Sequence, residues 1–249
     1  MRILFINPNT SVSFTGRIEQ IARQYAQAGT EVLVRNPAAG PRSIESVYDE
    51  VLSTPGTLEV ALQLLDQVDG LAVACYSDHP AIYALREATT KPVIGIAEAS
   101  MYLACMLGRR FSVVTTNQEW EPLLWDAVRR YGLAERCASV RSTGLPVLAL
   151  ESTSPKKTYT LIRNAARKAL DEDGAEVICL GCAGMAGMDK AMQAYLHVPV
   201  LDGVVCALKL LEGMLGYGVQ TSKRLTYRTP GFKELVNLPG LFTRVYKKK

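Results

Sequence analysis

The fold is decided by two stretches of sequence, DGLAVAC at residues 69–75 and EVICLGC at residues 176–182. Each is a short apolar run opened by an acidic residue, which predicts a buried strand. Both runs end on a cysteine, and Cys182 follows Cys75 by 107 residues (182 − 75). A strand that recurs with the same closing residue suggests a chain built from two like halves.

Two further pairs of segments keep nearly the same separation. Pro199 follows Pro92 by 107 residues (199 − 92), and each proline opens a similar strand. RILFINPN at residues 2–9 loosely matches RFSVVTTN at residues 110–117, at an offset of 108. Three matches close to one register indicate an internal repeat rather than chance.

Short β-branched runs alternate with longer amphipathic stretches, which is typical of an α/β fold with mostly parallel sheets. The predicted strands are 2–7, 30–35, 69–75, 92–96, 111–116, 138–143, 175–181 and 198–202. The predicted helices are 11–28, 54–67, 80–89, 98–107, 118–131, 155–172, 187–195 and 203–216. We expect two pseudo-symmetric lobes, each a mostly parallel sheet flanked by helices, with the active site between them. The first lobe would comprise residues 1–97 plus about 205–249, and the second residues 98–204.

The composition is that of an ordinary globular enzyme. Of the 249 residues, 48% are hydrophobic and 21% are charged. Part of the net charge of +4 lies in Lys247–Lys249, which we interpret as a solvated tail. No basic stripe with interleaved aromatics and no apolar run of membrane-spanning length occurs, so neither nucleic acid nor a membrane is expected as a partner.

The six cysteines predict free thiols in a reducing cytoplasm, because the first strand begins at Arg2 and leaves no room for a signal peptide. Only Cys179 and Cys182 are closely spaced, and the chain has two histidines, so no metal site is expected. A thioredoxin-like redox pair is disfavoured, because such a motif opens a helix and Cys179 lies inside an apolar strand.

The position of the repeated cysteines suggests their chemistry. Cys75 and Cys182 each close a strand ahead of a predicted helix, and ligands of open α/β sheets bind beyond the carboxyl ends of strands. Backbone N–H groups and the helix dipole there should lower the pKa of each thiol toward neutrality. Two such thiols, one per lobe, can act as a two-base pair in which one thiolate removes a proton while the other thiol delivers one.

The remaining four cysteines are interpreted as packing residues, because cysteine is among the residue types most often fully buried. They are Cys105, Cys137, Cys179 and Cys206. Cys179 lies three residues before Cys182, so the two side chains should face opposite sides of their strand.

Four motifs carry a resemblance to a known family: NPNTS at residues 7–11, GPRSIES at 40–46, the segment around Cys75, and LGCAGM at 180–185. They are similar to the motifs of hydantoin racemases, in the aspartate/glutamate racemase superfamily, and the likeness extends to about residue 222. The resemblance implies two like lobes, no cofactor, and acid/base roles for Cys75 and Cys182.

The residues expected to surround the substrate lie on the loops that follow the strands. They are Asn9 and Ser11, Thr115 and Thr116, Ser77 and Asp78, and Ala183 and Gly184. The chain has YSD at residues 76–78 where the family often has FGD, so Ser77 adds a hydroxyl to the pocket or narrows it. Asp78 is expected to cap the following helix or to orient the loop, and His79 either tunes Cys75 or lies on the surface.

These features favour a cofactor-independent racemase that interconverts the D and L forms of 5-monosubstituted hydantoins or allantoin. The substrate would be a neutral ring whose C5–H is acidified by the adjacent carbonyl and whose amides Asn, Ser, Thr and backbone groups can satisfy. A free amino acid would need cationic groups for its carboxylate, and the motifs contain none.

Three alternatives remain open: an amino-acid racemase, another enzyme of the superfamily such as a decarboxylase or a cis–trans isomerase, and a two-lobed small-molecule-binding protein without catalytic activity. The presence of two cysteines argues against decarboxylation, which commonly needs one thiol. The segment from Ser222 onward, with Tyr227, Phe232, Leu235, Leu241 and Phe242, packs on its own subunit or on a neighbour. We favour a contact between subunits of a homo-oligomer.

Overall fold

The computed structural model describes residues 1–246, and the predicted solvated tail at Lys247–Lys249 lies outside the described residues. The strands form two separate four-stranded sheets in which every pair is parallel. The first sheet has the order β2 (Glu31–Arg35), β1 (Arg2–Ile6), β3 (Gly70–Val73), β4 (Val93–Gly95). The second has the order β6 (Cys137–Ser142), β5 (Phe111–Thr115), β7 (Val177–Leu180), β8 (Val200–Asp202).

The two sheets share one topology. In each, the first strand of the half pairs with the second on one side and with the third on the other, and the fourth follows the third. This confirms the predicted α/β fold of two like halves with parallel sheets. After the first strand the chain crosses to one edge of the sheet, and after the third strand it crosses to the other edge. The carboxyl ends of these two strands therefore form a switch point, which is where open α/β sheets bind ligands.

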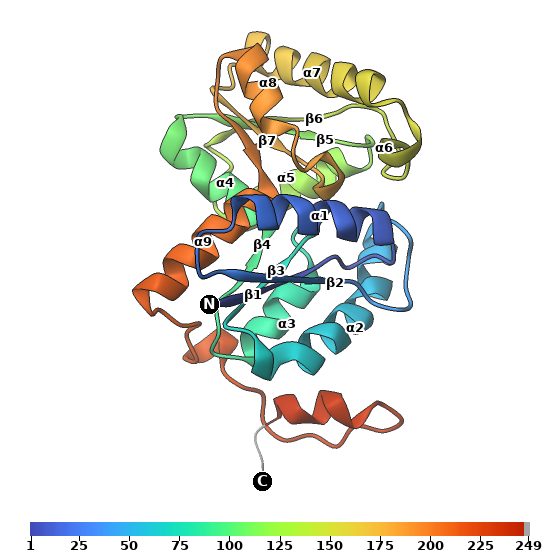
Figure 1. Ribbon diagram of the computed structural model, residues 1–249, viewed down its shortest axis with the longest axis vertical. Coiled ribbons are helices and arrows are strands. Elements are labelled where there is room, and N and C mark those ends of the chain that lie inside the picture. Colours follow the sequence, from blue (N-terminus) through green and yellow to red (C-terminus); the bar gives the residue numbers. More distant parts are fainter. Residues whose placement is uncertain (247–249) are drawn as a thin grey trace.

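Helices cover both faces of each sheet (Figure 1). Their bounds are α1 Val12–Tyr25, α2 Val47–Leu64, α3 Pro80–Ala88, α4 Ile96–Leu107, α5 Trp120–Arg130, α6 Ala149–Ser152, α7 Pro155–Asp171, α8 Asp189–Leu196 and α9 Gly203–Tyr217. α2 and α3 pack on the outer face of the first sheet, and α7 and α8 on that of the second. Between the sheets lie α1, α4, α5 and α9, whose buried side chains join one continuous core with residues of both sheets.

The helical periodicity of the sequence accounts for α1. The predicted apolar positions Phe14, Ile18 and Ile21 are buried, and Glu19 forms the expected ion pair with Arg23. The helix begins where the Ser11 hydroxyl accepts a hydrogen bond from the Phe14 N–H at 3.3 Å. Figure 1 shows α1 lying across the junction of the two sheets.

The predicted start of the second helix at residue 54 is wrong, because Pro55 lies inside the helix rather than opening it. α2 begins seven residues earlier (54 − 47), after Ser46, whose hydroxyl accepts a hydrogen bond from the Asp49 N–H at 3.2 Å. The apolar Val47, Tyr48 and Val51 of its first turns are exposed, so they give no sign of a buried face.

The predicted helix at 187–195 also begins later than expected. A single 3₁₀ turn, Ala183–Met185, follows Cys182, and α8 starts at Asp189. The short helix α6 falls in a segment where the sequence predicts no element.

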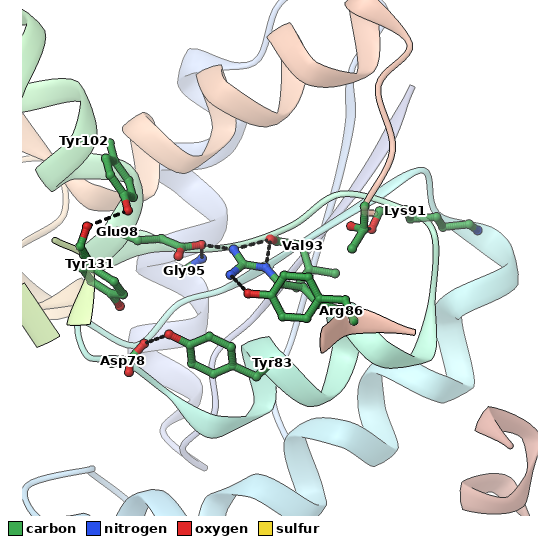
Figure 2. A network of polar contacts seen from close by, with 11 residues as sticks. Asp78, Tyr83, Arg86, Lys91, Val93, Gly95, Glu98, Tyr102 and Tyr131 are labelled. Atoms are coloured by element: carbon green, nitrogen blue, oxygen red, sulfur yellow. Dashed lines mark hydrogen bonds and ion pairs between the residues drawn. The ribbon is translucent and has the colours of Figure 1, made fainter. Parts of the chain in front are cut away.

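A buried ion pair fixes the passage from the first lobe to the second. Arg86 on α3 pairs with Glu98 in the first turn of α4, with only 17% and 8% of the two side chains exposed. Arg86 also donates to the Val93 carbonyl at 2.9 Å, and Glu98 accepts from the Gly95 N–H at 3.0 Å (Figure 2). The end of β4 and the start of α4 are therefore held in one orientation by charge-assisted hydrogen bonds.

Residues 222–246 pack on their own subunit, which is the placement that the sequence analysis did not favour. They lie beneath α2 and α3 (Figure 1), where Leu235 and Phe242 face Leu58 and Ala84 across an apolar pocket. The Lys223 ammonium donates to the Arg86 and Glu87 carbonyls at the end of α3. Within residues 1–246 no helix is both long and apolar enough to cross a bilayer.

Candidate active site

A small cavity opens between the lobes, at the carboxyl ends of the central strands of both sheets. Both repeated cysteines line it, each just beyond the third strand of its half. Four further predicted residues also line this cavity: Asn9, Thr116, Ala183 and Gly184. The topology thus brings residues that lie more than 170 positions apart in the sequence to one small space.

The walls of the cavity include residues that the sequence analysis did not assign to a site. They are Asn7, Phe14, Ile44, Ala74, Tyr76, Trp120, Val147 and Gly181. Phe14 and Trp120 lie on helices, where their spacing indicates only core packing. Asn7 is the first residue of the NPNTS motif, and this motif is the feature of the sequence that could have indicated its place in the cavity wall.

Asn7 organises the loop after β1. Its side chain is fully buried and its amide nitrogen donates to Asn9 Oδ1 at 2.9 Å, to the Ser11 carbonyl at 3.2 Å and to Thr15 Oγ1 at 3.0 Å. Asn9 Oδ1 in turn accepts from the Ser11 N–H at 2.9 Å. These bonds engage the Asn9 side-chain oxygen and fix the position of Asn9 in the cavity wall.

Cys75 lies two residues beyond β3. Its sulfur accepts a hydrogen bond from the Ser77 hydroxyl at 3.3 Å. Burial raises the pKa of the Cys75 thiol well above its usual range, and the negative charge of Glu50 raises it further. The Ser77 hydroxyl acts in the opposite sense, because it stabilises the thiolate.

Cys182 lies at the start of the 3₁₀ turn that follows β7. The Gly184 N–H donates to its sulfur at 3.4 Å. Burial raises the pKa of the Cys182 thiol to about 11, and the Gly184 N–H and the Arg17 charge offset part of that rise. The charge of Glu45 raises this pKa. Of the two thiols, Cys182 is therefore the easier to ionise.

The expectation that a helix start lowers both thiol pKa values is wrong. α3 begins only at Pro80, five residues after Cys75, so its dipole does not act on that sulfur at close range. At Cys182 the expected N–H donor is present, but it belongs to one short 3₁₀ turn and is outweighed by the loss of hydration. The cavity therefore stabilises the protonated form of both cysteines.

Close backbone approach explains the glycines on either side of Cys182. A Cβ at Gly181 would lie 2.8 Å from the Val114 carbonyl oxygen and 3.1 Å from the Thr115 Cα, both in the neighbouring strand β5. A Cβ at Gly184 would lie 2.8 Å from Leu150 Cδ1 and 2.9 Å from Phe14 Cε1. The absence of side chains at these positions keeps the cavity open and the cysteine close to β5.

Four of the predicted substrate-binding residues do not line the cavity. Ser11 caps α1 and also donates to Glu151 Oε1 at 2.9 Å. The Thr115 hydroxyl donates to the Gly181 carbonyl at 3.1 Å, which ties β5 to the Cys182 loop. Ser77 is not part of the lining and donates a hydrogen bond to the Cys75 sulfur.

Asp78, the fourth, joins the two lobes instead of capping α3. It forms an ion pair with Arg130 at the end of α5 and accepts a hydrogen bond from the Tyr83 hydroxyl at 2.6 Å (Figure 2 shows the Tyr83 contact). The cap of α3 is His79, whose Nδ1 accepts from the Ala81 N–H at 3.2 Å.

His79 is fully buried, so its expected place on the surface is wrong. Its Nε2 bonds to the Ser53 hydroxyl at 2.9 Å, and burial lowers the pKa of the ring to about 4. Both ring nitrogens are thus engaged, which leaves none to tune Cys75. Across residues 1–246 no three His, Cys, Asp or Glu side chains gather as a metal site requires.

Comparison with known proteins places this geometry in a family. The family model of Asp/Glu/Hydantoin racemases matches residues 3–211, which is most of the chain. The chain belongs to the Asp/Glu/Hydantoin racemase family. It is therefore an isomerase of the racemase type.

Similar family members share nearly the full length of the chain. A hydantoin racemase of Pseudomonas sp. (strain NS671) is 44% identical over 245 residues, which cover 98% of each chain. The structure of the allantoin racemase from Klebsiella pneumoniae has a TM-score of 0.91 and 40% identity, over 99% of each chain. That of the allantoin racemase from Pseudomonas fluorescens has a TM-score of 0.90 and 39% identity, over 95% of this racemase and 100% of that chain.

Proposed function

We propose that this racemase interconverts the D and L forms of a 5-monosubstituted hydantoin or of allantoin, with Cys75 and Cys182 as its two acid/base groups. The observation that carries the proposal is the meeting of two symmetry-related thiols in one cavity between the lobes. The names of the similar family members point to the same ring chemistry.

The reaction is a proton exchange at the ring carbon C5. One cysteine, as thiolate, takes the C5 proton, and the electron pair of that bond moves onto the ring carbonyl oxygen as an enolate. The other cysteine, as thiol, gives its proton to C5 from the opposite face. The product is the other enantiomer, and the two cysteines have exchanged protonation states. Because Cys182 ionises more easily, it is the cysteine of the pair that first becomes the thiolate base, with Cys75 as the acid.

The uncharged polar lining suits a neutral ring. Asn9, Thr116 and backbone groups of the Cys182 loop can pair with the ring amides, while Phe14 and Ile44 offer apolar contact for the substituent. Among the described residues that line the cavity there is no lysine or arginine, so a free amino acid would find no cation for its carboxylate.

The same chemistry needs no cofactor, because the adjacent ring carbonyl acidifies the C5 proton. The six free thiols suit a reducing cytoplasm. We also favour a homo-oligomer, because the first turns of α2 expose Val47, Tyr48, Val51 and Leu52, with half or more of each side chain open to solvent.

Deuterium exchange tests the proposed function. Single enantiomers of 5-isopropylhydantoin, 5-benzylhydantoin and allantoin are incubated with the protein in deuterated water, and optical rotation and C5 deuterium are followed. We expect rotation to decay to zero and deuterium to enter at C5. L-glutamate serves as the control for an amino-acid racemase. If none of the rings changes while glutamate racemises, the proposal is wrong.

The raised pKa of Cys182 predicts an alkaline activity profile. At neutral pH nearly all of this thiol is protonated, since its pKa is about 11. As long as the pH is below that value, each increase of one pH unit should raise the thiolate fraction about tenfold. We expect kcat/KM to rise by the same factor. The measurement is kcat/KM for one hydantoin enantiomer from pH 6 to pH 10, corrected for the rate without protein. A kcat/KM that is constant across this range would contradict the assignment of Cys182 as the base.

A further inference from the structure

Residues 144–153, which we call the strap, link β6 to α7 and contain the short helix α6. Val147 of the strap lines the cavity, and Leu150 is buried in one apolar cluster with Phe14 of α1. Figure 1 shows α6 beside one end of α1, so this segment of the second half of the chain reaches the first half at the cavity. The strap has no part in the acid/base chemistry described above.

The chain is fixed in place just before the strap begins. The Thr143 N–H donates to the Thr115 and Thr116 carbonyls, both at 2.9 Å, which ties this point to β5. Gly144 follows with a φ of +73°, in the left-handed region, and a Cβ there would meet no atom within 4 Å. A glycine with this conformation and open space around it is suited to act as a hinge.

Glu151 joins the strap to α1. Its Oε1 accepts a hydrogen bond from the Ser11 hydroxyl at 2.9 Å and another from the Ser13 hydroxyl. The first turn of α1 contains no acidic residue, so the Glu151 carboxylate supplies the negative charge that a helix N-terminus favours. Glu151 is exposed, and water can replace its two partners when they separate. The contact is therefore specific and reversible.

A second carboxylate makes a contact in the opposite direction. Glu45 lies in the loop before α2, and its Oε2 accepts from the Val147 N–H of the strap at 3.4 Å. The neighbouring Ile44 lines the cavity together with Val147. Because 3.4 Å is long for an N–H···O hydrogen bond, the two hydroxyls that bind Glu151 form the stronger connection between the strap and the first half of the chain.

We propose that the strap opens and closes over the cavity and that Glu151 latches it in the closed position through Ser11 and Ser13. When the latch breaks, rotation about Gly144 carries Val147 away from the cavity, so that substrate enters and product leaves. When the latch holds, the strap keeps water away from the enolate. Glu151 is a positioning residue, because neither it nor its two partners line the cavity. That the strap covers a hydantoin rests on the proposed function, whereas the latch is independent of it.

Hydrogen–deuterium exchange tests the latch without any substrate. Amide exchange of residues 145–150 is followed by peptide mass spectrometry, because these amides exchange when the strap opens. In Glu151→Ala we expect them to exchange about fivefold faster than in the parent, which is the effect of losing one ordinary hydrogen bond. Glu151→Gln keeps an oxygen that accepts from both hydroxyls, so its exchange rate should lie between those of the parent and Glu151→Ala.

Glu172→Ala is the matched control. Glu172 is also an exposed glutamate of the second half of the chain, but it pairs with Arg141 in the same half. Its loss should leave the exchange of residues 145–150 unchanged. Unchanged exchange of these residues in Glu151→Ala would overturn the proposal. An equal rise in β5 and α7 would indicate a general loss of stability and would overturn it as well.

A double-mutant cycle tests whether the latch works through α1. Ser13→Ala removes one of the two hydroxyls and leaves Ser11 to cap the helix. In that background Glu151→Ala should speed the exchange of the strap by a smaller factor than in the parent, because part of the contact is already lost. Equal factors in both backgrounds would mean that Glu151 acts without Ser13 and would contradict the proposed contact.

Kinetics separates a latch from a general structural role. A weaker latch lets bound substrate escape, so in Glu151→Ala we expect KM for a hydantoin to rise about fivefold while kcat stays within about twofold of the parent value. A lower kcat at unchanged KM would mean that Glu151 holds the Cys182 loop in place instead, and the proposal would be wrong. If no hydantoin is racemised but strap exchange still rises in Glu151→Ala, the proposed function fails and the latch stands.

Discussion

Serine at either Cys75 or Cys182 is expected to abolish racemisation while leaving proton exchange with one enantiomer. A serine hydroxyl is a far weaker acid than a thiol, so the variant lacks one of the two acid/base groups, and we expect a loss of about 10³-fold or more in kcat. The remaining thiolate can still remove and return the C5 proton on its own face. In deuterated water each variant should therefore label one enantiomer without inverting it, and the two variants should label opposite enantiomers.

Cys105→Ser is the matched control for these variants. Cys105 lies on α4 and does not line the cavity, so we expect it to be replaced without loss of activity. A single-serine variant at position 75 or 182 that racemises at the parent rate would refute the two-base scheme. Labelling of the same enantiomer by both variants would refute the assignment of one cysteine to each face.

Alanine at Gly181 is expected to lower kcat/KM about 100-fold and to destabilise the fold by about 2 kcal/mol. The added methyl group would meet the Val114 carbonyl oxygen at 2.8 Å and the Thr115 Cα at 3.1 Å, and neither backbone atom can turn away as a side chain would. β7 and the loop after it must then shift away from β5, which moves the adjacent Cys182. The measurements are urea unfolding and the rate of racemisation.

Gly213→Ala provides the comparison within the same chain. Gly213 lies in α9, and a Cβ there meets no atom within 4 Å. Alanine at that position should stabilise the helix by about 0.5–1 kcal/mol and leave the rate unchanged. Were Gly181→Ala to behave like this control, the close packing of β5 on the Cys182 loop could not be what places that cysteine.

The sequence predicts the sheets well because every central strand is a short apolar run buried on both faces. The starts of the helices were harder to predict, for physical reasons. Ser46 caps α2 in a region whose apolar side chains are exposed, and Pro55 looks like a helix start although it lies within the helix. A proline removes only one backbone hydrogen bond, so a long helix can accommodate it.

At the site, the repeat identified the two cysteines but not their surroundings. The cavity is lined by Asn9, Thr116, Ala183 and Gly184 as predicted, because loops after equivalent strands meet at the switch point. The charge of Glu50, which raises the pKa of Cys75, comes from α2, and α2 is not part of either repeated motif. Local sequence does not show which distant side chain will pack against a thiol, so its pKa was predicted in the wrong direction.

The core that runs between the two sheets has a consequence for folding. Side chains of α1, α4, α5 and α9 join residues of both sheets in one uninterrupted cluster. Neither half can expose its inner face without removing the packing partners of the other, so the halves should melt together in one cooperative transition. A repeat that is visible as two units in the sequence would then behave as a single unit in calorimetry.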